Sequence, residues 1–165
     1  MIAKTYISQN LNKIERLFNE AKNPQSSRFY SKLAILELGG WIEMSMDDLI
    51  KRLAKRKLRQ PATIKRVEEI IESNFGFGYK KNFKNKMLLQ IVGLVGVEKF
   101  DRKVNGIKIQ KLMSSLDALK KHRDQEAHEY TKALAKPIDA PSVTKGRLVI
   151  IYEGLIEIER VLKKL

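Results

Sequence analysis

The chain has 165 residues, 43% of them hydrophobic, which suffices for one compact domain with an apolar core. It has no cysteine, so disulfide bonds, cysteine metal sites and thiol catalysis are excluded. Its 33 lysines and arginines exceed its 19 aspartates and glutamates by 33 − 19 = 14, an excess that favours nucleic acid as a partner ahead of a membrane. The alternative interpretation of this charge is a solvated, lysine-rich surface.

Apolar residues recur at helical spacing in the first part of the chain. They predict three helices, over residues 3–22, 28–58 and 64–74. Thr63 is expected to cap the third helix. Residues 33–44 are apolar on nearly every side, which is typical of the inner helix of a bundle. Gly39 and Gly40 lower helix propensity within that segment, so we expect another backbone to approach closely there.

The second part of the chain is also predicted to be helical, with no strand. We expect a loop at 73–82, helices at 83–97 and 107–135, a turn at 101–106, and a last helix that Ser142 caps. The pattern predicts an all-α, up-and-down bundle of four to five main helices. One domain should span residues 1–165.

Several classes of site and location are not expected. The chain has only two histidines and no visible cluster of carboxylates, so we expect no metal site and no cofactor. No apolar run approaches the roughly 20 residues of a membrane span, and the first residues lack the apolar segment of a signal peptide. These features predict a cytoplasmic protein that does not span a membrane.

The stretch at residues 122–130, His-Arg-Asp-Gln-Glu-Ala-His-Glu-Tyr, contains both histidines. The apolar series before it comprises Ile109, Leu112, Leu116 and Leu119, and it places Arg123 at the next core-facing position. A guanidinium cannot lose its charge, so Arg123 must find an anion, a partner chain or a wet cleft. His128 lies five residues on, toward the flank of the same helix, and Asp124 shares its face.

Arg123, Asp124, three further residues and His128 resemble the signature of the HEPN superfamily (higher eukaryotes and prokaryotes nucleotide-binding domains). That signature is an arginine followed by four to six residues and a histidine. With Tyr130, the stretch resembles the Arg-x4-His-x-Tyr form of HEPN toxins that are paired with nucleotidyltransferase antitoxins. The resemblance implies a helical bundle acting as a metal-independent endoribonuclease at a homodimer cleft, in a toxin or antiviral defence role.

The residue types in this stretch suit RNA cleavage without a metal. Histidine, with an ordinary pKa of about 6.5, can move the proton at the attacking 2′-oxygen or the leaving 5′-oxygen. Arginine offers a planar array of donors to the phosphoryl oxygens. Arg123 and His128 are therefore the candidate catalytic residues, and Asp124 is expected to orient the ring of His128. Tyr130 is expected to line the cleft or to accept a nucleotide from a partner enzyme.

Each of these residues also has a structural interpretation. Arg123 could form an ion pair with a carboxylate on a neighbouring helix, and His128 could be a surface residue. Asp124 could make an ordinary contact one turn along the helix. Tyr130 could simply pack against the apolar face.

Other positive groups are candidates for nucleic-acid binding. The candidates at the end of the second predicted helix lie on one side of it and are Arg52, Lys55, Arg56 and Arg59. His122 is a possible phosphate contact. Residues 75–83 interleave aromatic residues with lysines, as base-stacking surfaces do, although anchoring of a loop to the core is the interpretation that we favour.

Two functions other than a ribonuclease are also consistent with the sequence. One is a catalytically silent HEPN module that binds nucleotide, RNA or a protein partner. The other is a basic helical nucleic-acid-binding protein in which the motif is accidental.

Overall fold

The computed structural model describes residues 1–128 and 137–165, with all their side chains except those of Ala127 and His128. This part of the chain contains helices and no strand. Its elements are α1 (Thr5–Asn19), α2 (Pro24–Lys57), α3 (Pro61–Glu72), the π-helical segment η1 (Tyr79–Leu88), α4 (Leu89–Lys103), α5 (Gly106–His128) and α6 (Pro141–Leu162). The predicted all-α fold is confirmed. Within the described ranges, no helix is long and apolar enough to cross a membrane.

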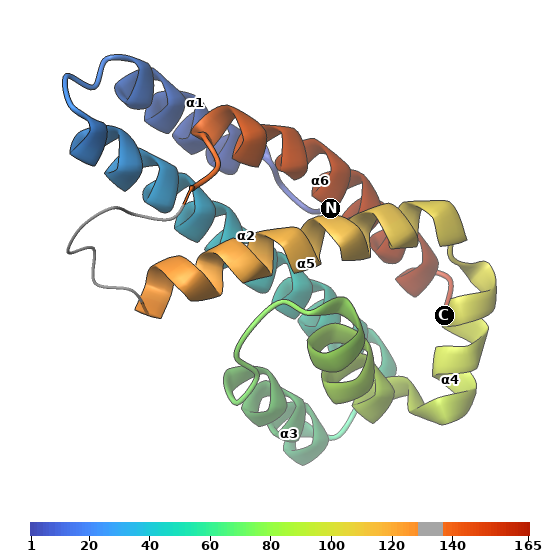
Figure 1. Ribbon diagram of the computed structural model, residues 1–165. Coiled ribbons are helices and arrows are strands. Elements are labelled where there is room, and N and C mark those ends of the chain that lie inside the picture. Colours follow the sequence, from blue (N-terminus) through green and yellow to red (C-terminus); the bar gives the residue numbers. More distant parts are fainter. Residues whose placement is uncertain (129–136) are drawn as a thin grey trace.

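Four helices, α1, α2, α5 and α6, form the bundle, and consecutive members run in opposite directions (Figure 1). The shorter elements α3, η1 and α4 form a second group that packs against α2 (Figure 1). The two groups share one apolar core. Its largest fully buried side chains are Leu11, Ile35, Leu38, Ile42, Met46, Ile50, Leu53, Phe77, Phe83, Met87, Leu88 and Phe100.

Proline opens three of the helices, at Pro24, Pro61 and Pro141. Proline suits the first helical position because its φ is already helical and its missing N–H would have had no partner there. The predicted caps Thr63 and Ser142 are therefore wrong, since both residues lie inside helices that begin earlier. The second helix likewise begins four residues before its predicted start.

The segment between α3 and α5 differs from its prediction. The loop predicted at 73–82 ends at Gly78, because the π-helical turns of η1 begin with Tyr79. The predicted turn at 101–106 begins later, since α4 continues to Lys103. A kink within α4 lies at Gly93, whose φ of +65° is a conformation that glycine adopts readily.

The central part of α2 is only partly an inner helix. Ala34, Ile35, Leu38 and Ile42 are fully buried, as the prediction of an inner helix requires. The prediction of burial on nearly every side is wrong, however. Another face of the same helix exposes large apolar side chains, namely Phe29, Leu33, Leu36 and Met44.

Candidate functional site

The second half of α5 carries the motif. The predicted apolar stripe of Ile109, Leu112, Leu116 and Leu119 is buried against the bundle. Arg123 continues this stripe, and 23% of its side chain is exposed. The helix extends to His128, whose side chain lies outside the described part, as does the whole of Tyr130.

The guanidinium of Arg123 is held by a carboxylate from α2. Its Nη1 donates a hydrogen bond to Oε1 of Glu43 at 2.5 Å. Its Nε lies 3.4 Å from Oδ1 of Asp124, which is a weaker contact. This is the ion pair with a neighbouring helix that the sequence left open, and it offsets the cost of placing a charged group on an apolar stripe.

An aromatic ring forms one side of the same site. The Cζ atom of Arg123 lies 4.9 Å from the centroid of the Phe77 ring, which is a favourable cation–π distance. Phe77 itself is fully buried. The ring and Glu43 together fix the plane of the guanidinium, so the direction of its remaining donors is also fixed.

Two glycines leave room for this arginine. A Cβ added at Gly39 would meet Arg123 Cδ and Phe77 Cε1, each at 3.3 Å. A Cβ added at Gly76 would lie 3.9 Å from Arg123 Nη2. The predicted close approach at Gly39 is therefore made by two side chains and not by a backbone. Gly40, by contrast, faces open space.

The loop that supplies Gly76 and Phe77 is pinned by the buried amide of Asn82. Its Nδ2 donates to the carbonyl oxygen of Phe75 at 3.0 Å and to Oδ1 of Asn74 at 3.0 Å. Its Oδ1 accepts from the backbone N–H of Gly78 at 3.1 Å. One side chain at the start of η1 thus fixes the loop that contacts Arg123.

Asp124 contacts two cations of its own helix. Lys120 Nζ donates to its Oδ2, and Arg123 lies on its other oxygen. The hydrogen bond from Lys120 is the main cause that lowers the pKa of Asp124, so this residue is an anion at neutral pH. The predicted orientation of the His128 ring by Asp124 stays a prediction, because that ring lies outside the described side chains.

A further titratable carboxylate, which neighbours Glu43 on α2, was missed from sequence. Asp47 lies one helical turn after Glu43 on α2, and burial, with added repulsion from Glu43 and Asp48, raises its pKa to about 6. Lys51 acts in the opposite direction but is outweighed. The spacing of Glu43 and Asp47 in the sequence places both carboxylates on one side of a helix. The sequence does not show that this helix, α2, packs against Arg123.

His122 is directed to a different part of the bundle. Its Nε2 lies 3.2 Å from Oδ2 of Asp139, and the same oxygen lies 2.6 Å from Nη2 of Arg147 at the start of α6. A second ion pair nearby joins Arg28 to the buried Glu126 at 2.7 Å. The predicted phosphate contact of His122 would have to compete with Asp139.

The basic run on α2 is partly engaged with the end of α6. Arg52 pairs with the buried Glu159 at 2.7 Å, and Arg56 donates to the carbonyl oxygen of Leu162. Carbonyl groups at a helix C-terminus lack intrahelical partners and attract cations, which explains the contact of Arg56. Lys55 is exposed on α2, and Arg59 lies just beyond its last residue. Binding of nucleic acid by these four cations stays a prediction.

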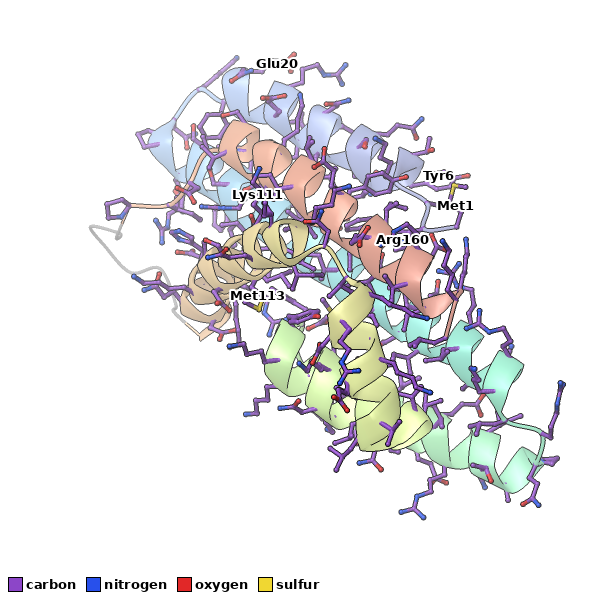
Figure 2. All side chains as sticks on the ribbon, turned by 90° about the vertical axis from the view of Figure 1, so that its right-hand side faces the viewer. Met1, Tyr6, Glu20, Lys111, Met113 and Arg160 are labelled. Atoms are coloured by element: carbon purple, nitrogen blue, oxygen red, sulfur yellow. The ribbon has the colours of Figure 1, made fainter. Side chains whose placement is uncertain are left out.

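Other possible sites do not coincide with the motif. A groove between the first residues, α1 and α2 is lined by apolar side chains such as Met1 and Tyr6, which lie together at the edge of the molecule (Figure 2). It includes no residue from 122–128. Across the described ranges, no group of three or more histidine, aspartate or glutamate side chains could hold a metal ion.

No family model, curated protein or solved structure matches this chain.

Proposed function

We propose that this protein is a metal-independent endoribonuclease of the HEPN type, with Arg123 and His128 as its catalytic residues. The observation that supports this most is the fixed guanidinium of Arg123, held by Glu43 and stacked on Phe77 while still partly exposed. It lies on the same helix as His128, five residues earlier. The net charge of +14 favours a polyanionic substrate.

The proposed reaction uses the RNA's own 2′-hydroxyl. The 2′-oxygen attacks the adjacent phosphorus, the bond from phosphorus to the 5′-oxygen breaks, and a 2′,3′-cyclic phosphate is left. His128 takes the proton of the 2′-hydroxyl or gives one to the leaving 5′-oxygen. Arg123 stabilises the charge on the phosphoryl oxygens. A guanidinium has five N–H donors, so the bond to Glu43 leaves others for phosphate.

The remaining parts of the proposal come from the resemblance. Two protomers would face each other across α5 and pool their copies of Arg123 and His128 in one cleft. The biological role would be that of a toxin or an antiviral effector in the cytoplasm. A nucleotidyltransferase antitoxin that modifies Tyr130 would be a possible partner.

The decisive experiment is RNA cleavage in the presence of EDTA by wild type, Arg123→Ala and His128→Ala. Each variant should lose about 10²- to 10⁴-fold in rate, the usual contribution of one such group. Arg102→Ala is the matched control, because this exposed arginine of α4 contacts only Glu98 among the pairs described. Products of wild type should carry cyclic phosphate ends.

Arg123→Ala also removes contacts with Glu43 and Phe77, so its helicity and thermal unfolding must be measured alongside. Arg123→Lys separates the two effects, since it keeps the charge and loses the planar donor array. Wild-type rates in both alanine variants, or an absolute need for a metal ion, would contradict the mechanism.

The contact with Glu43 also favours a second function. A permanent ion pair would neutralise the charge that catalysis needs, and the protein would then be a silent HEPN-like module that binds RNA, a nucleotide or a protein. RNA affinity without cleavage by wild type would support this module. Cleavage that depends on His128 would exclude it.

A further inference from the structure

Residues 75–83, which cover the end of the loop before η1 and the first turns of η1, expose one aromatic side chain and bury three. Phe75 is 87% exposed, whereas Phe77, Tyr79 and Phe83 are all buried. Anchoring of the loop to the core, the interpretation that we favoured from sequence, thus holds for three of the four rings. Phe75 needs another explanation, because an aromatic ring left in water forgoes a large gain from burial.

The backbone that carries Phe75 is fixed. Its carbonyl oxygen accepts the hydrogen bond from Asn82, and the preceding Asn74 binds the same amide through its side chain. At the start of the loop, Lys86 Nζ donates to the carbonyl oxygen of Ser73. A ligand that stacks on Phe75 would therefore meet a ring whose backbone is already ordered, and little conformational entropy would be lost on binding.

The two residues that follow Phe75 in sequence, Gly76 and Phe77, determine its position. Gly76 lies next to the Nη2 atom of Arg123, and its φ of +103° turns the chain between an exposed and a buried ring. Phe77 then stacks against the same guanidinium. Figure 1 shows this loop rising from α3 toward α5. Phe75 thus directly precedes, in sequence, two residues that lie against the proposed phosphate-binding arginine.

The charge around the loop selects the class of ligand. Lys80 and Lys81 are exposed in the first turn of η1, and neither has a described acidic partner. An exposed ring in a loop that contacts an arginine and that two exposed lysines follow suits a ligand that combines flat bases with a phosphate backbone. A protein partner would need a wider apolar surface than this single ring.

We propose that Phe75 is a base-stacking subsite for single-stranded RNA, adjacent to the phosphate bound by Arg123. This inference rests on the proposed function for the identity of the ligand. Stacking uses the face of a base, which a duplex does not offer, so the subsite selects unpaired RNA. It accepts every base, and purines bind more tightly because their faces are larger.

Binding should be measured in the His128→Ala background, so that the RNA stays intact. The probe is fluorescein-labelled single-stranded RNA of about eight nucleotides, followed by anisotropy. Adding Phe75→Ala should weaken binding about 5- to 150-fold, the range for one stacked base, and Phe75→Trp should restore it. The control is Tyr6→Ala, a similarly exposed aromatic on α1 (Figure 2), which should bind as the background protein does.

A series of RNAs, each with one abasic nucleotide, tests the stacking itself. When the abasic nucleotide lies at the position that stacks on Phe75, the proteins with Phe75 and with alanine should bind the RNA equally, because the stacked base is missing. Equal affinities of the Phe75 and Phe75→Ala proteins for the RNA with all its bases, the same effect of Phe75→Ala on every abasic RNA, or no RNA binding by any protein would overturn the subsite.

The two proposals can fail separately. Cleavage that depends on His128, together with unchanged binding by Phe75→Ala, would refute the subsite and leave the ribonuclease standing. Binding that depends on Phe75 without cleavage by wild type would refute the ribonuclease and leave the subsite standing.

Discussion

Glu43 has two charged neighbours, Arg123 on α5 and Asp47 on its own helix. Its Oε1 accepts the hydrogen bond from Arg123, and Asp47 follows one helical turn later on α2. Burial raises the pKa of Asp47 to about 6, and the negative charge of Glu43 adds to the effect. A carboxyl group whose pKa is raised to about 6 therefore lies one helical turn from the carboxylate that holds Arg123.

The raised pKa of Asp47 predicts a particular dependence of stability on pH. The folded protein holds this proton more tightly than the unfolded chain, whose ordinary value is 3.8. The contribution of Asp47 to the free energy of unfolding therefore falls as pH rises from about 4 to about 6. Asp47→Asn removes this loss, so the variant should gain stability over wild type as pH rises and should be the more stable protein at pH 7.

Urea unfolding at about pH 4, pH 5 and pH 7 measures this difference directly. Asp117→Asn, an exposed change of the same kind on α5, is the control. Carboxylates with lowered pKa values, such as Asp124 and Glu157, affect all three proteins alike and cancel in the comparison. Parallel profiles for wild type and Asp47→Asn would show that burial of Asp47 does not disfavour its anion.

At the scale of elements, the two adjacent glycines of α2 have opposite surroundings. Gly39 faces Arg123 and Phe77, while Gly40 faces open space. Both lower helix propensity by a similar amount, so any difference between their alanine variants must come from what the added methyl group meets.

Gly40→Ala should stabilise the protein by about 0.5–1 kcal/mol, the usual gain within a helix. Gly39→Ala should instead be less stable than wild type, because crowding in a packed region typically costs about 1–3 kcal/mol and outweighs the same gain. Thermal or urea unfolding of the two variants checks this. Equal stabilisation by both changes would mean that Arg123 and Phe77 can move away freely.

These elements also show what the sequence could predict. The helices follow from apolar spacing, because one face of each must be buried, and the stripe of α5 identified Arg123 as out of place. The partner of Arg123 could not be predicted, since α2 contains several acidic residues and the crossing of α5 over α2 decides which of them it meets. The α-helical period also did not predict η1, whose π-helical turns follow a different spacing.

The basic run of α2 illustrates the same limit. The spacing of Arg52 and Arg56 predicts that they lie on one side of the helix, and in the structure both contact the end of α6. What lies opposite is the C-terminal end of α6, which is distant in sequence. A cation read as a ligand for phosphate can thus be a ligand for the protein's own carbonyl groups, and only the tertiary structure distinguishes the two.

At the scale of the whole molecule, some positive side chains are paired within the bundle and others are exposed to solvent. Several arginines are paired with carboxylates inside the bundle, as the pairs of Arg28 with Glu126 and of Arg123 with Glu43 show. Exposed cations such as Lys80, Lys81, Arg59 and Arg66 therefore contribute more to the outer field than the paired arginines do. A polyanion approaching the molecule would be attracted chiefly by such exposed cations.

Assembly of two copies gives the prediction at this scale. If a shared cleft uses Arg123 of one protomer with His128 of the other, mixing the Arg123→Ala and His128→Ala proteins should restore cleavage that neither has alone. Sedimentation should show a dimer at the assay concentration. Mixed dimers that form, detected by native mass spectrometry, and yet remain inactive would contradict the shared cleft, as would a fully active monomer.

The several contacts of Arg123 have a consequence for how such chains evolve. Its guanidinium joins α2, the loop before η1 and α5, so a descendant that had lost the proposed reaction would still be under selection to keep the arginine for its fold. The role proposed for His128 is catalytic, so loss of the reaction would remove that constraint on position 128. Among diverging relatives, loss of the histidine while the arginine persists would be the mark of a lineage that abandoned the chemistry and retained the domain.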